Sequence, residues 1–382
     1  MDVYLDHAAT TPPDPEVLAA MAAVHASAPG NPSSPHRAGR RARHLLEDAR
    51  ARLAHALGAR TEEMVFVRGG TEGDNLAVLG RALQARREGR ERPVVAVSAI
   101  EHPAVRSAAE AVRSLGGTPL HLRVRPDGRI EPEDLERALH ARPAVVSVMW
   151  VNNETGLQPA LAPVLAQAEA AGVPVHTDAV QAVGKVPVRL DRDAVHLLTL
   201  TGHKLGGPTG VGALFVRAGT PLAPLLHGGG QERALRPGTE DVAGAVGLAT
   251  AVERAVREQP GRATSWGALG ARLEAGLRAR VPGLVVHGAE GPRAPHILNV
   301  GLPGVDGDAV RAGLDLEGVA VSGGSACASG SGKGSHVLEA LYGPGLDRAA
   351  LRFSFGANTT LSDVDDALRA LSAVLDRLEV PA

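Results

Sequence analysis

The stretch VPVHTDAVQAVGKVPVRLDRDAVHLLTLTGHKLGGPTGVGALFV, residues 173–216, decides the fold. It contains short runs that are almost wholly apolar, and similar runs occur earlier in the chain. Such runs are typical of strands that are buried on both faces of a sheet. The runs lie at 63–67, 93–98, 144–151, 173–177, 195–200 and 211–216. Helical stretches separate most of them, so the pattern predicts an α/β fold with a largely parallel sheet covered on both sides.

Helix patterns and a Pro/Gly segment outside this stretch predict two domains. HLLEDARARLAHALG (44–58) is amphipathic and should end at Gly58. A helix at about 241–258 leads into the polar Pro/Gly segment REQPGRATS (257–265), where we expect a break. We therefore predict a large α/β domain over 14–258, and a smaller α+β domain formed by 1–13 and 259–382.

The last predicted helix lies in SDVDDALRALSAVLDRLEV, residues 362–380. Ser362 and Asp365 resemble a capping box at its start. Its apolar residues recur at helical spacing and should form one buried face. They are Val364, Leu368, Leu371, Leu375 and Leu378.

Composition limits the partners and the compartment. The formal net charge of −2 argues against nucleic acid or an anionic membrane surface as the main partner. The N-terminal residues do not resemble a signal peptide, and no run of about 18 uncharged apolar residues predicts a membrane span. The single cysteine, Cys327, cannot form an internal disulfide. We therefore expect a cytoplasmic protein that binds neither nucleic acid nor membrane.

Five of the predicted strands are followed by polar or glycine-rich clusters. These are RGGTEGDN (68–75), AIEHP (99–103), NNETG (152–156), DAVQAVGK (178–185) and TGHKLGGPTG (201–210). Since ligands bind beyond the carboxyl ends of parallel strands, the clusters should meet at one edge of the sheet. Gly70 and Thr71 stand where a helix is expected to begin, which favours an anion such as phosphate. An ordinary strand-to-helix turn is the alternative.

A lysine directly follows one of these strands. The turn TGHK contains Thr201, His203 and Lys204. Partial burial lowers the pKa of a lysine amine and makes it a candidate for Schiff-base chemistry. Asp178, at the end of the preceding strand, suits the protonated nitrogen of a pyridine cofactor, and His102 is placed to stack on such a ring. The alternatives are a solvated loop lysine and a structural histidine.

His176 and Asp178 also alternate along one strand and share a face, as metal ligands do. Further ligands at diagnostic spacing are missing from the sequence. We therefore expect no metal site at this position.

The lone cysteine lies in SGGSACASG, residues 322–330. Free cysteine is usually a small buried hydrophobe. Cys327 instead lies among serine, glycine and alanine, with no bulky apolar neighbour. Two interpretations of Cys327 are open. It is an incidental surface thiol, or it is a nucleophile on a loop that can move.

Together these segments resemble a known family. The chain is similar to the NifS/IscS-type cysteine desulfurases, within the class V aminotransferase group of fold-type I pyridoxal-phosphate enzymes. The resemblance covers nearly the whole chain, and its motifs occur in the family's order. Besides the segments above, it rests on YLDHAATTP (4–12), GNPSSPHRAG (30–39), GGGQERALRPGTED (228–241) and LRFSFG (351–356). It implies a mainly parallel seven-stranded sheet, with the catalytic cysteine loop at about 322–335 in the smaller domain.

The resemblance implies roles for the central residues. Lys204, His102 and Cys327 would be catalytic. Lys204 would hold pyridoxal 5'-phosphate as a Schiff base, and His102 would stack on its ring and assist proton transfer. Asp178 would pair with the ring nitrogen, and Gln181 with the ring hydroxyl.

The resemblance also implies peripheral contacts. Asn153 and Arg352 would bind the substrate carboxylate, which the planar fork of an arginine matches. Further cofactor contacts would come from Asn153, Gly70, Thr71, Thr201, Gly202, His203 and, in a homodimer, Thr239 of the partner subunit.

The implied reaction gives the lone cysteine a function. The cofactor would act as an electron sink when the Cα of L-cysteine loses its proton. The Cys327 thiolate would attack the substrate sulfur, leaving an enzyme persulfide and releasing L-alanine. Lys333 and His336 are expected to help stabilise that thiolate.

The persulfide would pass its sulfur to an acceptor protein, such as an iron–sulfur scaffold or a sulfur carrier. The pathways would be iron–sulfur cluster assembly or thiolation, and Cys327 is also a candidate transient iron–sulfur ligand. Same-fold alternatives are a selenocysteine lyase and a class V aminotransferase. A sulfur-binding or regulatory protein without turnover is a further alternative, against which the set Lys204, Asp178, His102 and Cys327 speaks.

Two departures from the family pattern qualify these expectations. Arg68 stands where a small hydroxyl residue is common in the family. The sequence ends directly after the last predicted helix, whereas similar enzymes that dock an iron–sulfur scaffold often continue. This second departure bears on the iron–sulfur scaffold as a partner and not on the chemistry.

Overall fold

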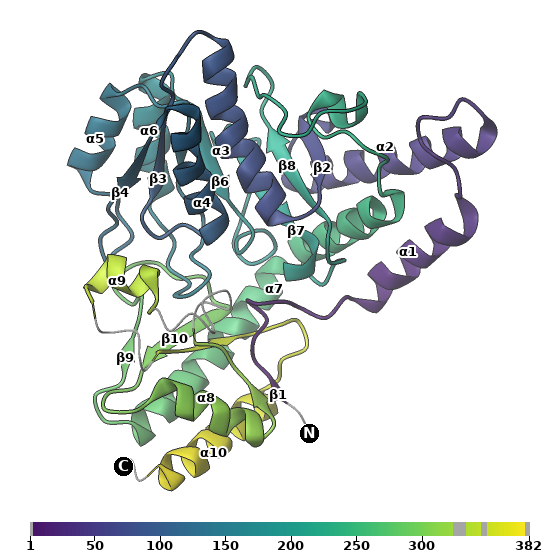
Figure 1. Cartoon of the computed structure of the whole chain (residues 1–382). Helices are drawn as coiled ribbons and strands as arrows, with labels where there is room; N and C mark the ends of the chain where they lie inside the picture. The colour runs from purple at the N-terminus through teal and green to yellow at the C-terminus, as the bar shows by residue number, and fades with distance from the viewer. Residues whose placement is uncertain (1–2, 324–333, 345–349, 379–382) are drawn as a thin grey trace.

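A seven-stranded sheet with the order β2-β8-β7-β6-β5-β3-β4 lies at the centre of this computed structural model (Figure 1). The structure describes residues 3–323, 334–344 and 350–378. The strands are β2 (Met64–Val67), β3 (Val94–Ser98), β4 (Thr118–Leu122), β5 (Val146–Ser147), β6 (Val175–Asp178), β7 (Leu197–Thr201) and β8 (Gly212–Val216). β8 runs antiparallel to both of its neighbours, and the other pairs are parallel. The mainly parallel α/β sheet is confirmed.

Helices cover both faces of this sheet. They are α2 (Arg37–Leu57), α3 (Gly70–Arg87), α4 (Pro103–Ala111), α5 (Pro132–His140), α6 (Leu161–Ala170) and α7 (Val242–Arg280). Successive strand residues point to opposite faces. Val95 and Val97 accordingly pack with residues of α3 and α4, whereas Ala96 packs with residues of α5 and α6. α2 ends at Gly58, whose φ of 71° is the left-handed cap predicted from the sequence.

Short 3-10 helices and one separate α-helix complete this part of the chain. They are α1 (Pro15–Ser27), η1 (Thr61–Glu63), η2 (Val112–Leu115), η3 (Gly202–Lys204) and η4 (Gln231–Ala234). β5 is shorter than the predicted run at 144–151. On the β3 side, Met149 N donates to the carboxylate of Glu101, whereas on the β6 side Val148 N and Trp150 N still donate to the carbonyls of His176 and Asp178.

The C-terminal part has its own core and its own sheets, in the lower half of Figure 1. A sheet with the order β12-β10-β9 is accompanied by a β1-β11 pair. The elements are β1 (Val3–Tyr4), β9 (Val285–Val286), β10 (Ile297–Gly301), α8 (Gly307–Leu316), β11 (Val319–Ala320), α9 (His336–Tyr342), β12 (Ala350–Ser354) and α10 (Leu361–Arg377). Because β1 pairs with β11, the N-terminal residues lie with this part.

The predicted break at 257–265 is wrong. α7 continues through Pro260 and has 39 residues. An internal proline costs a helix about 3 kcal/mol. Both halves of α7 offset this cost, because the first half packs against the large sheet and Trp266, Leu273 and Leu277 pack in the C-terminal core. Within the described residues, no helix, α7 included, combines the length and apolar character needed to cross a membrane.

The last helix begins with a different capping box from the one predicted. Thr360 and Asp363 form the box, because Thr360 is the extended residue before the first helical turn. The predicted Ser362–Asp365 pair is therefore wrong. Of the predicted apolar face, Val364, Leu371 and Leu375 are buried and Leu368 is partly buried. Leu378 follows the helix and is 41% exposed.

Candidate active site

The polar clusters that follow the strands meet at one edge of the large sheet. Asp178 ends β6, His102 follows β3, and Lys204 closes the turn after β7. Nitrogen and oxygen atoms of Asp74, His102 and Asp178 lie within 4.8 Å of one another. A ligand at this edge would therefore face groups from several strands at once.

Lys204 is held by the N-terminal strap, which we define as residues 4–11. Its Nζ donates to the carbonyl of Ala8 at 2.6 Å and to that of Ala9 at 2.5 Å. The Nε2 of Gln181 donates to the same Ala8 carbonyl at 2.8 Å. One backbone oxygen thus holds the predicted cofactor lysine and the predicted partner of the ring hydroxyl in a fixed relation.

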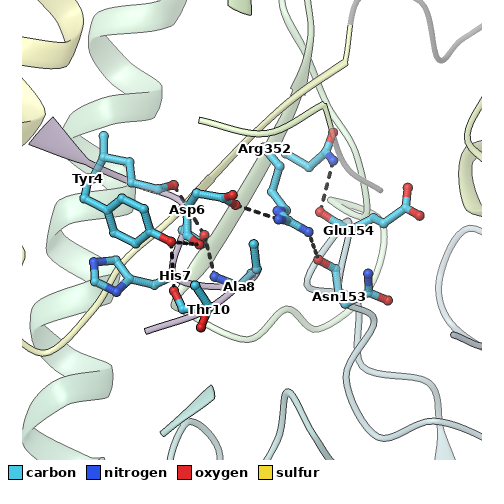
Figure 2. Close-up of polar contacts among 12 residues, drawn as sticks. Tyr4, Asp6, His7, Ala8, Thr10, Asn153, Glu154 and Arg352 are labelled. Carbon is cyan, nitrogen blue, oxygen red and sulfur yellow. Dashed lines mark hydrogen bonds and ion pairs between the residues drawn. The ribbon is translucent and has the colours of Figure 1, made fainter. Parts of the chain in front are cut away.

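The strap is fastened to β12. Ala8 N donates to Ser354 Oγ at 2.8 Å, and Ser354 N donates to the carbonyl of Leu5 at 2.7 Å. The Tyr4 hydroxyl closes the strap by donating to the carbonyls of Asp6 and Thr10 (Figure 2). The backbone that holds Lys204 therefore belongs to the C-terminal core.

Arg352 lies on the other side of the strap, between Asp6 and Asn153 (Figure 2). Its Nη2 donates to Asp6 Oδ1 at 2.7 Å, and its Nη1 donates to the carbonyl of Asn153 at 2.8 Å. Arg352 is 1% exposed, so its charge needs a partner. The structure brings together the two residues predicted to bind the substrate carboxylate and adds Asp6, which was not predicted.

Burial controls the charge of the predicted ring partners. It raises the pKa of Asp178, against the opposing effects of His102, the Val180 amide and Lys204. It lowers the pKa of His102, with Lys204 acting in the same direction and Asp178 against it. His102 Nδ1 accepts from Ala104 N at 3.1 Å as the cap of α4, so neutral His102 carries its hydrogen on Nε2.

Two further carboxyl groups lie buried beneath Asp178. Burial, together with the Asp178 charge, raises the pKa of Glu101 to about 8 and that of Asp74 well above its usual range. Glu101 Oε1 accepts from Ser98 Oγ and Met149 N. Asp74 Oδ1 and Glu101 Oε2 have no hydrogen-bond partner among the described residues. Glu101 therefore holds its proton at neutral pH, and burial favours the protonated form of Asp74 as well.

His176 is part of the same buried layer and has structural partners. Its Nδ1 lies 2.9 Å from Ser147 Oγ, and its Nε2 lies 3.0 Å from Thr199 Oγ1. Burial lowers its pKa to about 3. These hydrogen bonds favour a satisfied core histidine over the metal pair with Asp178 that was considered from the sequence.

The predicted phosphate residues lie around the start of α3. Gly69 caps this helix with a φ of 126°, and Gly70 begins it. A Cβ on Gly70 would lie 3.0 Å from Val180 Cγ2, so the backbone approaches closely here. His203 Nδ1 lies 3.2 Å from Thr10 Oγ1, and burial followed by Lys204 lowers the His203 pKa to about 4.

The remaining phosphate candidates differ in exposure. Thr201 and Gly202 are buried, and Thr201 Oγ1 donates to the carbonyl of Val211. Thr71 and Thr239 are exposed. Arg68, which stands where the family commonly has a small hydroxyl residue, forms an ion pair in which its Nη1 lies 3.1 Å from Asp241 Oδ2.

Cys327 and Lys333 lie outside the described residues. The described residues that flank this segment form hydrogen bonds with Arg352 and Glu154. Ser322 exchanges backbone hydrogen bonds with Arg352, and Ser335 Oγ donates to Glu154 Oε2 at 2.5 Å. The chain therefore enters and leaves this segment beside the predicted carboxylate-binding residues.

His336, which begins α9, is half-buried. Burial lowers its pKa to about 4, so it is neutral at neutral pH. Its Nε2 donates to the carbonyl of Glu101 at 2.9 Å. The prediction that His336 helps to stabilise the Cys327 thiolate stays a prediction, because Cys327 lies outside the described residues.

Several residues of the site were not predicted from the sequence. Asp6, Ala8, Asp74 and Glu101 lie inside motifs that had been noticed for other residues, and His296 had no signal. Each lies beside a residue of the site that is distant in the sequence, and a sequence does not show which side chains lie together.

Comparison with known proteins gives this geometry a family. Residues 3–367 match the family described as aminotransferase class-V. The chain belongs to that family. This aminotransferase class-V chain is 38% identical over 378 residues to "Cysteine desulfurase IscS" of Dictyoglomus turgidum, covering 99% of the chain and 95% of that protein.

Two further relatives agree with this aminotransferase class-V membership. "Cysteine desulfurase NifS" of Azotobacter vinelandii is 41% identical over 379 residues, which cover 99% of the chain and 93% of that protein. Among solved structures, a "NIFS-LIKE PROTEIN" superimposes with a TM-score of 0.89 at 31% identity, covering 99% of this chain and all of the other. The aminotransferase class-V fold therefore extends over nearly the whole chain.

Proposed function

We propose that the protein is a pyridoxal-phosphate-dependent cysteine desulfurase that forms a persulfide on Cys327. The observation that carries the proposal is the meeting of Lys204, His102 and Asp178 at one edge of the sheet, with Arg352 beside them. The relatives named cysteine desulfurase support the choice of substrate. The products would be L-alanine and enzyme-bound sulfur.

The residues present fit pyridoxal phosphate. Asp178 is a buried acid beside His102 and Lys204, and burial raises its pKa, so a protonated pyridine nitrogen would stabilise its carboxylate form. The start of α3 after Gly69 offers backbone amides to a phosphate. Lys204 would hold the aldehyde through its amine. When bound, the group supplies an electron sink for negative charge at the substrate Cα.

Arg352 would bind and orient the substrate through its carboxylate. In the structure its fork donates to Asp6 and to the carbonyl of Asn153. A buried arginine binds a carboxylate more strongly than an exposed one, because water competes less. The strap would then set the distance between Arg352, which contacts Asp6, and Lys204, which contacts Ala8.

His102 and Lys204 would handle protons near the substrate. Neutral His102 presents its Nε2–H, since Nδ1 accepts from the backbone of α4. Lys204 is the amine that approaches Cα once the substrate has taken its place, and it would remove the proton there. Both groups are half-buried, which limits the access of water to them.

Cys327 would complete the reaction. Its thiolate sulfur forms a bond to the substrate sulfur, and the bond between that sulfur and the substrate Cβ breaks. The electron pair stays on the carbon, which takes up a proton, so L-cysteine and one thiol give L-alanine and one persulfide. A thiol reductant then releases sulfide and restores the thiol.

The partners and the oligomer are part of the same proposal. We propose a homodimer in which Thr239 of the partner subunit contacts the phosphate. It is supported by the exposure of Thr239 and by α1, which is apolar along its length but leaves Leu18 49% exposed. A sulfur acceptor and a cytoplasmic location, where thiols stay reduced, complete the proposal.

The test measures both products. Purified protein is incubated with pyridoxal phosphate, L-cysteine and a thiol reductant, beside Cys327→Ala and Cys327→Ser. We expect alanine and sulfide in equal amounts from the wild type, and a loss of at least 100-fold in both variants. Equal activity of the variants and the wild type would contradict the proposal and favour an aminotransferase. Turnover of L-selenocysteine with none of L-cysteine would favour a lyase.

A further inference from the structure

His296 contacts the amide of Gln181 from the side opposite the strap. Its Nε2 lies 3.1 Å from Gln181 Oε1, while Gln181 Nε2 donates to the carbonyl of Ala8 at 2.8 Å. The Ala8 oxygen can only accept, so the nitrogen of the amide must face it and the oxygen must face His296. The two contacts together fix which way round the amide lies.

His296 is neutral in this position. It is completely buried, and burial followed by the charges of Lys185, Arg352 and His7 lowers its pKa well below the usual range. A neutral imidazole has one N–H, and Gln181 Oε1 cannot donate, so the hydrogen lies on Nε2. His296 Nδ1 has no hydrogen-bond partner among the described residues. The hydrogen bond from Nε2–H to Gln181 is therefore the one that the His296 ring forms among them.

We propose that His296 is a positioning residue that, through the Gln181 amide, directs a hydrogen-bond donor to the ring hydroxyl of the cofactor. Gln181 Nε2 carries two hydrogens, and Ala8 takes one of them. The second hydrogen is the one that would be donated to the ring hydroxyl of the cofactor. The inference rests on the proposed function in one respect, which is that pyridoxal phosphate binds with its hydroxyl near Gln181.

Removing the His296 donor leaves Gln181 Oε1 buried without a partner. A buried unpaired carbonyl oxygen is costly, so the amide would rotate toward another donor. Its nitrogen would then no longer point at the cofactor. The anionic form of the ring hydroxyl would lose a donor, and the bound chromophore would hold its proton more tightly.

The test is a pH titration of the visible absorbance of the cofactor-loaded protein, which needs no turnover. We expect His296→Met to raise the midpoint of the absorbance change by about 1 pH unit, the effect of one hydrogen bond. His296→Gln should restore the wild-type midpoint, because its amide nitrogen can occupy the place of Nε2. His296→Asn is too short to do so and should behave like His296→Met.

A second buried histidine provides the control. His287 Nδ1 lies 2.7 Å from Asn299 Oδ1, so it forms a similar histidine–amide pair away from Gln181. His287→Met should lower thermal stability and leave the midpoint unchanged. Gln181→Met should raise the midpoint, and the double variant with His296→Met should raise it no further, because both changes remove one donor.

Two results would overturn the inference. A wild-type midpoint in both His296→Met and His296→Asn would show that the donor does not depend on His296. Equal shifts in the His287 and His296 variants would show an effect of stability alone. If the wild type takes up no pyridoxal phosphate, the proposed function fails as well, and that failure is visible before any variant is made.

Discussion

The two sides of the active site hold their charges in different ways. On the cofactor side, the carboxyls of Asp178, Asp74 and Glu101 lie buried together, and burial raises the pKa of each. On the substrate side, the buried guanidinium of Arg352 is paired with Asp6 at 2.7 Å. Burial therefore sets the protonation on one side, and an ion pair fixes the charge on the other.

This difference matches what each side would bind. A pyridine ring brings a proton of its own, so a site for it must leave one carboxylate uncompensated until the ring arrives. A substrate carboxylate brings only negative charge, so its site must keep an arginine positive throughout. The strap joins the two sides, since Asp6 contacts Arg352 and Ala8 contacts Lys204.

The largest effect expected concerns the cofactor side. Asp178→Asn removes the negative charge expected to hold the proton on the ring, and we predict that kcat/KM for L-cysteine falls about 10³-fold. The absorbance spectrum of the loaded protein should change as well. Steady-state kinetics and the resting spectrum check this, and an unchanged spectrum would place the ring elsewhere.

Arg352→Ala tests the substrate side. We predict that KM for L-cysteine rises about 100-fold, because the carboxylate loses a buried bidentate partner. The resting absorbance spectrum should stay the same, since Arg352 does not belong to the cofactor side. The two kinetic constants are measured separately, and a fall in kcat with an unchanged KM would contradict the division between the sides.

Asp6→Asn sharpens the same division through stability. The asparagine keeps an acceptor for Arg352 but removes the compensating charge, which should lower the free energy of unfolding by about 2 kcal/mol. Urea unfolding of the loaded protein measures this. Arg272→Gln is a suitable control, since its ion pair with Asp365 is exposed and should contribute at most about 1 kcal/mol. Equal losses in both variants would contradict the assigned role of Asp6.

Glu101→Gln should change the pH dependence of stability. The pKa of Glu101 is about 8 in the folded protein against an ordinary value of 4.5, so between these values the folded state holds one proton more than the unfolded state. Raising the pH through this window should therefore reduce wild-type stability by up to about 1.4 kcal/mol per pH unit. The glutamine variant should show a flatter dependence in urea unfolding at pH 5–8. An identical slope in both proteins would show that Glu101 does not carry the extra proton.

The sequence predicted the large sheet well, for a physical reason. Strands buried on both faces must be continuously apolar, so the run at 195–200 identified β7 directly. The run at 144–151 exceeds β5, because Met149 N donates to the carboxylate of Glu101 on the β3 side, although Val148 N and Trp150 N still donate to β6. Pro260 likewise suggested a break that the packing of α7 on two cores overrides.

The site was predictable only where a motif marked it. Lys204, Asp178 and His102 follow strands in polar clusters, and parallel strands bring their carboxyl ends to one edge. Asp6 and His296 act through partners that are distant in the sequence, since Asp6 pairs with Arg352 and His296 contacts Gln181. No local pattern encodes such pairs, and the pKa of a group such as Asp74 depends on which side chains are buried around it.

One measurement tests the account most directly. Cofactor-loaded wild type and Arg352→Ala are titrated with L-cysteine while the visible spectrum is recorded. We predict identical resting spectra, a spectral change in both proteins, and a half-saturation concentration about 100-fold higher in the variant. A resting spectrum altered by Arg352→Ala, or a wild-type spectrum that L-cysteine leaves unchanged, would contradict it.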